Sequence, residues 1–550
     1  MATHPLDATP SNPPRTGRSF DHKIHPAGVA GFLAVLLGGL VYAGISIAMD
    51  TNHVGEPLAI GAFLFLGLAL LIALGFEFVN GFHDTANAVA TVIYTNSLAP
   101  VFAVIWSGAW NFIGVVISTG AVAYSIITLL PVDLILGVGS AGGYAMIFAL
   151  LIAAVAWNLG TWWFGLPNSS SHALIGSILG VGLANQLMAT GPGGAAGVQW
   201  DQAESVLLAL LFSPVIGFVG AALLLWAMKR VIPNKALYQE PKADTPPPWP
   251  IRALLVFTCT AVSFAHGGND GQKGMGLIML ILIGVAPTAY ALNRTMPDSS
   301  TPAFIQAAGA AQSVFRAKVA TAPVVTQDQA RATLENALRT RNADTPQVYA
   351  ALDASTSDIS KELKNYGSIR HVPAAATKNL RNEMYVVYGT LQMLTKDADK
   401  AKAAYPGGGD AKLKAYRDLL EKGTRFIPIW VKVAVALALG LGTMVGWKRI
   451  VVTVGEKIGK THLTYGMGAA AELVAASTIL LAQVKGMPVS TTHILSSGVA
   501  GTMVADGAGL QASTVRNIAM AWVLTLPAAM AIAGLLYALF ITIVRSTGLG

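Results

Sequence analysis

The sequence predicts an all-α integral membrane protein with about eleven transmembrane segments. Of its 550 residues, 53% are hydrophobic and only 12% are charged, and the mean hydropathy is +0.56. A soluble chain would carry about 25% charged residues. The apolar residues fall in runs of about 20 or more, which is the length that crosses a bilayer. The composition therefore excludes a soluble enzyme and a disordered chain.

The few charged residues are unevenly distributed, and nearly half of them lie in residues 292–424. The net charge of +8 is spread over loops and this polar region without a concentrated basic face, so we expect no binding to nucleic acid. The single cysteine, Cys259, lies inside an apolar run and can form no intramolecular disulfide.

The first elements are a polar, Pro-rich tail at 1–26 and an apolar run at 27–49. The run is about twice as long as the apolar part of a signal peptide, and no clear small-residue cleavage site follows it. We therefore expect an additional N-terminal transmembrane helix at 27–49 instead of a cleaved signal.

Ten further apolar stretches complete the predicted membrane part, at 58–95, 101–130, 144–164, 169–190, 204–228, 251–290, 426–447, 463–484, 490–508 and 518–545. The two longest, 58–95 and 251–290, carry polar, Gly-containing clusters near their middles. Lipid does not satisfy such groups. We therefore expect both helices to be interrupted at these clusters.

Basic residues in short loops predict the orientation, because Lys and Arg favour the cytoplasmic side. The tail at 1–26, the linker at 229–250 and the loop at 448–462 are basic, whereas 50–57 carries only two acidic residues. These loops predict a cytoplasmic N-terminus and an extracytoplasmic C-terminus. They also place residues 292–424 outside the cell, as an Ala-rich helical insert.

The same orientation makes 58–95 and 251–290 antiparallel, which is the relation that an inverted repeat requires. We assign a first repeat to 58–228 and a second repeat to 251–291 and 425–545. The insert at 292–424 interrupts the second repeat.

Two pairs of matching motifs support this division. Residues 80–88 match 266–274 at an offset of 186, which places Asp84 on Asp270. Residues 165–172 match 486–493 at an offset of 321. The two offsets differ by about the length of the insert, so the motifs have the same spacing in both halves once the insert is removed.

Asp84 and Asp270 are the first candidate site residues. An aspartate in hydrocarbon is unfavourable by several kcal/mol unless it is paired, protonated or faces a cavity. Two aspartates at equivalent points of a twofold repeat meet near the midplane. We expect them to bind the coupling cation or a metal ion. A structural ion pair with Lys273 or a histidine is the alternative.

The hydroxyl-rich runs that follow Pro167 and Pro488 resemble helix starts. Unpaired N–H groups and the positive end of the helix dipole make such starts anion sites. A single run is more often a helix cap or an interhelical hydrogen bond, but two runs in register favour a ligand. The predicted anion contacts are Ser169, Ser170, Ser171, Ser490, Thr491 and Thr492.

Further polar residues lie beside these motifs and form a second group of candidates. Glu77 and Glu472 are candidate coupling carboxylates, with a solvated helix end as the alternative for each. Four histidines, including His83 and His266, either carry protons or form hydrogen bonds at helix ends. The motifs contain no arginine, which favours a small oxyanion over an organic acid held by a guanidinium.

At these motifs the chain resembles the inorganic phosphate transporter family, and within it the bacterial low-affinity, proton-coupled group. The resemblance covers nearly everything from 58 to 545. The segments that carry it are 80–94 (NGFHDTANAVATVIY), 157–172 (WNLGTWWFGLPNSSSH), 265–284 (AHGGNDGQKGMGLIMLILIG), 442–460 (GTMVGWKRIVVTVGEKIGK) and 486–501 (GMPVSTTHILSSGVAG).

The resemblance implies symport of phosphate with a cation, which is Na⁺ in many members and H⁺ in the bacterial group. It implies that a neutral complex of phosphate with Mg²⁺ or a similar divalent metal is the substrate. It adds Asn87, Lys273 and Gln272 to the predicted phosphate site, and Asn269 to the cation site with His83. His83 and the pair Gln272–Lys273 depart from the usual family motif, which favours a proton or a metal over Na⁺ here.

Three other functions compete with this one. An intramembrane hydrolase would use one unique nucleophile, whereas the Ser–His pairs here are duplicated. Buried carboxylates on interrupted helices disfavour a channel, and a Na⁺-coupled or sulfate symporter differs only in its ligands. We expect a multi-pass protein of the inner membrane, in contact with lipid, without a permanent cofactor and with a homodimer as one oligomeric state.

Overall fold

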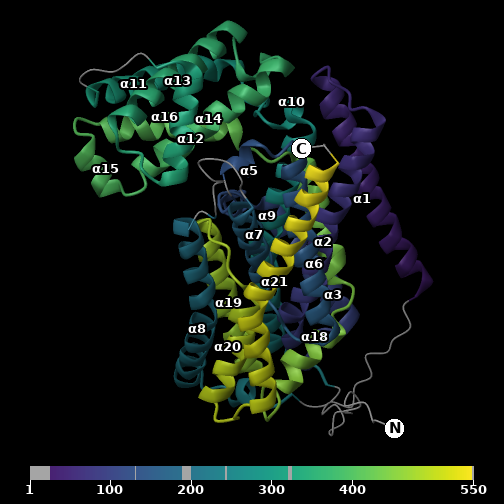
Figure 1. The fold of residues 1–550 in the computed structure, drawn as a ribbon. Coiled ribbons are helices and arrows are strands. Elements are labelled where there is room, and N and C mark those ends of the chain that lie inside the picture. Colours follow the sequence, from purple (N-terminus) through teal and green to yellow (C-terminus); the bar gives the residue numbers. More distant parts are fainter. Residues whose placement is uncertain are drawn as a thin grey trace.

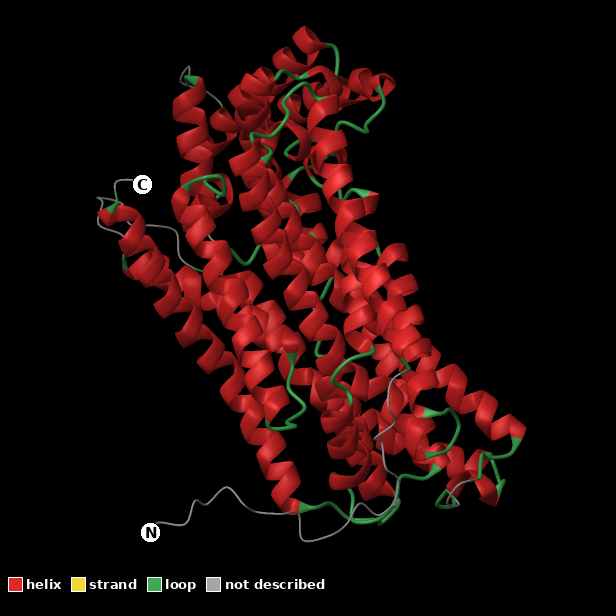
Figure 2. Cartoon of the chain, turned by 90° about the vertical axis from the view of Figure 1, so that its right-hand side faces the viewer, coloured by secondary structure: helices red, strands yellow, loops and turns green. Residues whose placement is uncertain are grey.

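The protein is a bundle of long helices with a second group of helices at one end (Figures 1 and 2). This computed structural model describes residues 25–130, 132–188, 198, 200–241, 245–319 and 325–547, without the side chains of 85–87, 133 and 201. All named regular elements of the described residues are helical, which confirms the predicted all-α class.

The first half of the membrane part contains eight helices. These are α1 (Pro26–His53), α2 (Ile60–Tyr94), α3 (Pro100–Ile117), α4 (Ala121–Ile127), α5 (Val132–Leu136), α6 (Ala141–Trp163), α7 (Ser170–Leu187) and α8 (Trp200–Val231). A short 3-10 helix, η1 (Lys235–Tyr238), lies in the linker to the second half.

The second half begins with α9 (Trp249–Val285) and α10 (Pro287–Tyr290) and resumes after the insert. Its remaining helices are α17 (Ile429–Thr443), α18 (Lys448–Val452), the π-helical turn η4 (Thr453–Lys457), α19 (Tyr465–Val484), α20 (Thr491–Ala505) and α21 (Ala512–Ser546).

The predicted count of eleven spans is not confirmed. Among the described residues, 8 helices are long and apolar enough to cross a membrane. The number rises to 9 if α16 (Gly409–Thr424) and α17, which are bent by 69° at their junction, count as one span. Helix α20, with 15 residues, is too short to meet the criterion. Helix α7 has 18 residues but starts with Ser170, Ser171 and His172, so it is not apolar enough.

The predicted interruption of the two long segments is wrong, because α2 and α9 run unbroken through their polar clusters. Their glycines serve close helix packing instead. A Cβ atom on Gly81 would lie 2.3 Å from the carbonyl oxygen of Leu439 in α17, and one on Gly267 would lie 2.1 Å from that of Asn111 in α3. The polar groups avoid lipid because neighbouring helices cover both clusters.

The breaks in the membrane part lie between α6 and α7 and between α19 and α20. Each contains a glycine with a left-handed backbone, Gly165 and Gly486, and both have a φ of +66°. Such a φ is strained for other residues. The two breaks are therefore equivalent turns, which the sequence match at offset 321 anticipated.

The packing of the two halves follows the inverted repeat. The contact of Gly81 in α2 with α17 repeats the contact of Gly267 in α9 with α3. In the same way α7 packs against α21 and α20 packs against α8. The helices that support each repeat's motifs therefore come largely from the other repeat.

The two helix pairs α6–α7 and α19–α20 enter the bundle from opposite ends. Gly139, just before α6, lies against Gly284 at the end of α9, beneath the insert. Gly466, at the start of α19, lies against Tyr238 of the linker. We call these pairs the first and the second hairpin, and their turns meet inside the bundle.

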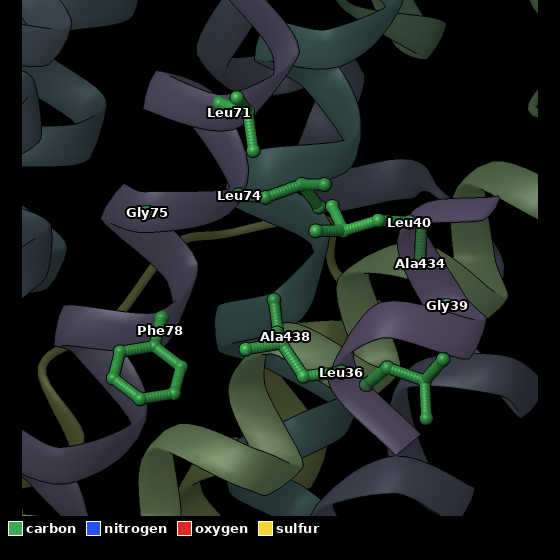
Figure 3. A pocket seen from close by; sticks show the side chains of 10 residues that line it. Leu36, Gly39, Leu40, Leu71, Leu74, Gly75, Phe78, Ala434 and Ala438 are labelled. Atoms are coloured by element: carbon green, nitrogen blue, oxygen red, sulfur yellow. The ribbon is translucent and has the colours of Figure 1, made fainter. Parts of the chain in front are cut away.

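Helix α1 lies at the edge of the bundle, beside α17 (Figure 1). Only three of its residues are buried. An apolar cavity of about 250 Å³ separates α1 from α2 and α17 (Figure 3). Since leucine, alanine, glycine and phenylalanine line it, this cavity has no group that would bind phosphate.

The described residues of the insert form six α-helices with their own apolar core, which includes Phe304, Phe315 and Tyr416. They are α11 (Thr301–Ala317), α12 (Gln327–Thr340), α13 (Pro346–Tyr366), α14 (Ala374–Leu394), α15 (Ala398–Ala404) and α16 (Gly409–Thr424), with the short 3-10 turns η2 (Asp298–Ser300) and η3 (Ile369–His371). Figure 1 shows the insert at the end of the bundle where α21 ends.

One buried carboxyl group makes the insert sensitive to pH. Glu383 of α14 is 3% exposed. Burial and the nearby charges of Asp358 and Glu362 raise its pKa from 4.5 to about 8. The folded insert therefore keeps this group protonated at neutral pH.

We predict that Gly81→Ala destabilises the bundle by about 1–3 kcal/mol, the usual effect of overpacking. The added methyl group cannot fit against Leu439 without separating α2 from α17. Gly75→Ala in the same helix is the control, because a Cβ there meets nothing within 4 Å. Thermal unfolding of the purified protein in detergent measures both, and equal midpoints for the two variants would contradict the packing argument.

We predict that the insert becomes less stable as the pH rises from about 4.5 to 8. Over this window the unfolded state releases the Glu383 proton while the folded state retains it. Hydrogen exchange of α13 and α14 in the whole protein, corrected for the intrinsic rate, should show this loss of protection. Glu383→Gln should flatten the pH dependence, and Asp328→Asn, at an exposed position of α12, should leave it unchanged.

Candidate functional site

The turns of the two hairpins each lead into a helix that starts with hydroxyl residues. Ser169 caps α7 by accepting a hydrogen bond from the backbone N–H of His172 at 3.2 Å. Ser490 caps α20 in the same way, from the N–H of His493 at 3.1 Å. The predicted helix starts are therefore confirmed, and the backbone N–H groups of both first turns point toward the middle of the bundle.

The two helix starts touch each other. The Ser171 hydroxyl of the first hairpin donates to the carbonyl oxygen of Val489 in the second, at 2.8 Å. The rings of His172 and His493 lie with their centroids 4.4 Å apart, and His493 stacks on Trp522 of α21. These contacts join two segments that are more than 300 residues apart in the sequence.

Asp84 of α2 connects both hairpins. Its Oδ2 accepts a hydrogen bond from Ser170 at 3.2 Å, and its Oδ1 accepts one from Thr492. One carboxylate therefore holds a residue of α7 and a residue of α20 at the same point.

Asp270 of α9 lies on the other side of the helix starts. Its Oδ1 accepts a hydrogen bond from Thr491 at 3.4 Å, and its Oδ2 lies 2.6 Å from Nζ of Lys273. The Lys273 ammonium also donates to Ser171 at 2.5 Å. Lys273 is fully buried, so it neutralises one carboxylate and places a positive charge beside the first hairpin.

His266 of α9 bridges the two aspartates. Its Nε2 lies 3.8 Å from Oδ2 of Asp84 and 3.5 Å from Oδ2 of Asp270. One ligand atom from each of these three residues lies within 4.8 Å of the others. This set of two carboxylates and an imidazole can hold a proton or a divalent cation.

A chain of hydrogen bonds fixes which ring nitrogen of His266 faces the carboxylates. The Thr443 hydroxyl donates to Leu439, and so it accepts from the Asn111 amide at 3.1 Å. The Asn111 carbonyl oxygen then accepts from Nδ1 of His266 at 2.9 Å. Because Nδ1 keeps its hydrogen, Nε2 is the atom that gains or lacks a proton between the two aspartates.

The motifs left open whether His266 carries a proton or only forms a hydrogen bond, and they do not include Asn111. Two signals were available for His266. It precedes Asp270 by four residues, which places both on one face of α9. It also occupies the position that the repeat offset of 186 equates with Asn80. Asn111 lies outside every matched motif, so only the packing of α3 on α9 reveals it.

The remaining predicted residues lie around this centre. His83 is 3.6 Å from Asp84 and 3.2 Å from the Thr161 hydroxyl. Asn269 donates to the backbone of Met487, at the second hairpin turn. The Asn87 side chain lies outside the described residues.

Three predicted residues do not contact the helix starts. The Gln272 amide accepts from the backbone N–H of Val122 and donates to Gly268, so it supports α4 instead of the anion site. Glu77 accepts from Asn80, and Glu472 accepts from Thr258 at 2.5 Å. Both carboxyl groups are completely buried, which excludes the solvated helix end considered for each.

The central residues are closed off from both ends of the bundle. Asp84 is 3% exposed, and Asp270 and Ser170 are each 1% exposed. A ligand therefore cannot reach this centre unless one of the hairpins or its neighbours moves.

The fold and the site together define a polytopic membrane protein with a buried, charged centre between its two halves. Residues 80–533 match the model of the phosphate transporter family. The chain belongs to this family, as the motifs predicted.

Named relatives are transporters. The chain is 41% identical over 503 residues to the low-affinity inorganic phosphate transporter PitB of Escherichia coli, covering 87% of this chain and 98% of PitB. It is 40% identical over 499 residues to PitA of the same bacterium, covering 87% and 97%. These names agree with the expectation of a non-enzymatic function.

A solved structure of a sodium-dependent phosphate transporter is also similar, with 19% identity and a TM-score of 0.45 over 87% of this chain and 99% of that one. The family assignment depends on the sequence relatives.

We predict that Lys273→Met destabilises the protein by about 3–5 kcal/mol, since it leaves Asp270 charged and buried without its partner. The double variant Asp270→Asn/Lys273→Met should recover most of this loss. Thermal unfolding midpoints in detergent measure both variants. A single variant as stable as the original protein would show that the pair contributes nothing to the fold.

Proposed function

We propose that this protein imports inorganic phosphate together with protons, by alternating access to the centre between the two hairpins. The main support for this proposal is that the Asp84 carboxylate accepts hydrogen bonds from both hairpins, from Ser170 of the first and Thr492 of the second. The relatives named as phosphate transporters supply the substrate.

The helix starts supply the contacts that a phosphate ion needs. The N–H groups at the start of α7 and α20 carry the positive ends of two helix dipoles. Hydroxyl groups of Ser171 and Thr491 and the Lys273 ammonium lie beside them. We assign phosphate to this position, in contact with Ser169, Ser170, Ser171, Ser490, Thr491 and Thr492.

The charges of the centre give the coupling a cause. Asp84 and Asp270 carry two negative charges, and Lys273 offsets one of them. At short range and low effective dielectric, the remaining carboxylate repels a phosphate dianion by several kcal/mol. A proton shared between His266 and the two aspartates removes this repulsion, and a divalent metal bound with the phosphate would do the same. Phosphate and proton therefore bind more tightly together than alone.

The position of Lys273 favours H⁺ over Na⁺ as the coupling ion. Its ammonium lies 2.6 Å from Asp270, where it provides the positive charge that a coupled Na⁺ would otherwise bring. Na⁺-coupled transport of phosphate or sulfate is the second candidate function. In that case Asp84 alone would bind the coupled Na⁺.

The opposed hairpins suggest how access alternates. The first hairpin opens toward the insert and the second toward the linker. Displacement of one hairpin would expose the centre to one side only. We propose that the end with the basic loops near η1 and α18 faces the cytoplasm, as the preference of Lys and Arg for that side suggests. The C-terminus and the insert would then lie on the outer side of the inner membrane. A homodimer is the assembly that we propose to test.

We predict that phosphate uptake by proteoliposomes follows an imposed pH gradient with Na⁺ absent, and that Mg²⁺ increases it. Asp84→Asn should reduce uptake at least about tenfold, because a hydrogen bond to a charged group contributes about 1.5–3 kcal/mol. It should also weaken the pH dependence.

Asp506→Asn is the matched control, because Asp506 pairs with Lys229 at the linker end of the bundle and not at the centre. If a Na⁺ gradient alone drove uptake, the coupling ion would be Na⁺ and the proposed proton coupling would be wrong. Full activity and unchanged pH dependence in Asp84→Asn would overturn the assigned site.

A further inference from the structure

A small cavity lies between the insert and the membrane part, away from the central site. It encloses about 80 Å³. The insert contributes Lys378, Arg381 and Asn382 of α14, and the membrane part contributes the segment after α5 and the junction of α9 with α10. Figure 1 shows α5 and α10 at this boundary.

Arg381 is a buried cation without an acidic partner. It is 5% exposed, and no ion pair joins it to a carboxylate among the side chains that the structure describes. Its Nη1 donates to the carbonyl oxygen of Ile135 at 3.3 Å and to Asn382 at 2.9 Å, while its Nε is buried without a partner.

Burial lowers the pKa of Arg381 to about 10, so the guanidinium remains charged at neutral pH. A buried charge without a counter-charge is strongly unfavourable. The nearby Arg425 adds further repulsion. The Tyr385 ring lies over the guanidinium at 5.2 Å, but this neutral ring does not replace a counter-charge, which an anion in the cavity would supply.

The other cavity residues fit a small anion. Lys378 is exposed and lines the cavity from the solvent side, where its charge attracts anions. The wall opposite combines the backbone of Gly139 and Gly284, which lie against each other, with the apolar side chains of Leu136, Val138, Ile283, Pro287 and Ala291. One water needs about 10–15 Å³ of such a cavity, so about 80 Å³ has room for a tetrahedral oxyanion but not for an organic acid of any size.

We propose that this cavity binds a small inorganic oxyanion of the phosphate and sulfate class, held by Arg381 and Lys378. The guanidinium offers paired N–H donors, which suit oxyanions better than chloride. Such an ion links α14 of the insert to the start of the first hairpin through Gly139, and to the end of α9 through Gly284. It therefore ties the insert to both repeats at the outer face.

The test is the thermal unfolding of the complete protein in detergent, titrated with sulfate, phosphate or chloride. A bound ion raises the midpoint in a saturable manner. We expect sulfate and phosphate to do so in the original protein, Lys378→Gln to require a roughly tenfold higher concentration, and Arg381→Gln to lose the saturable shift.

The control variant is Lys412→Gln, an exposed lysine of the insert on α16, which should behave like the original protein. Phosphate binding at the central site and the general stabilising effect of sulfate affect all variants alike. Binding in this cavity is therefore measured by the difference in unfolding midpoint between the cavity variants and Lys412→Gln. This difference should remain when Asp84→Asn is added to each of them.

Lys378→Gln is at the surface and tests the proposal even if Arg381→Gln does not fold. Equal titrations of Lys378→Gln and Lys412→Gln would overturn the site, and an equal shift with chloride would overturn the oxyanion class.

Discussion

The carboxylate of Asp84 is the constraint on which the rest of the molecule depends. It accepts hydrogen bonds from Ser170 and Thr492, and these residues begin helices that enter the bundle from opposite ends. Each helix start brings the positive end of a helix dipole. A buried negative charge can remain there only because both starts converge on it. The same charge would be strongly unfavourable if either hairpin withdrew, and this is the reason why the proposed transport cycle links the protonation of Asp84 to the hairpin positions.

Close helix packing is what brings these groups within reach of one another. Gly81 and Gly267 let α2 and α9 approach the backbones of α17 and α3 with no side chain between them. The approach of α3 also places Asn111 beside His266, which fixes the ring between the aspartates. The glycines beside each aspartate therefore set the geometry of the charged centre through packing, while the left-handed glycines Gly165 and Gly486 form the turns of the hairpins.

The sequence predicted the class, the repeats and most of the centre, because paired motifs carry two independent signals for each role. The Ser169 and Ser490 helix starts and the two aspartates follow from that pairing. The unbroken course of α2 and α9 could not be predicted, since a Gly-rich polar cluster is compatible both with an unwound helix and with tight packing. The hydrogen bond from His266 to Asn111 and the support of α4 by Gln272 could not be predicted either. Both depend on contacts between helices that the motifs do not encode.

The two repeats are equivalent in backbone but not in charge, and this difference shapes the proposed coupling. Lys273 stands where the repeat offset places Asn87, so one half has a built-in cation and the other has none. Asp270 is compensated by Lys273 at 2.6 Å. Among the described side chains, the partners of Asp84 are the hydroxyls of Ser170 and Thr492 and the imidazoles of His83 and His266. A strictly symmetric centre would bind two cations or none with each phosphate. The fixed ammonium instead leaves a single uncompensated charge, so one exchangeable positive charge at Asp84 is enough to admit the anion.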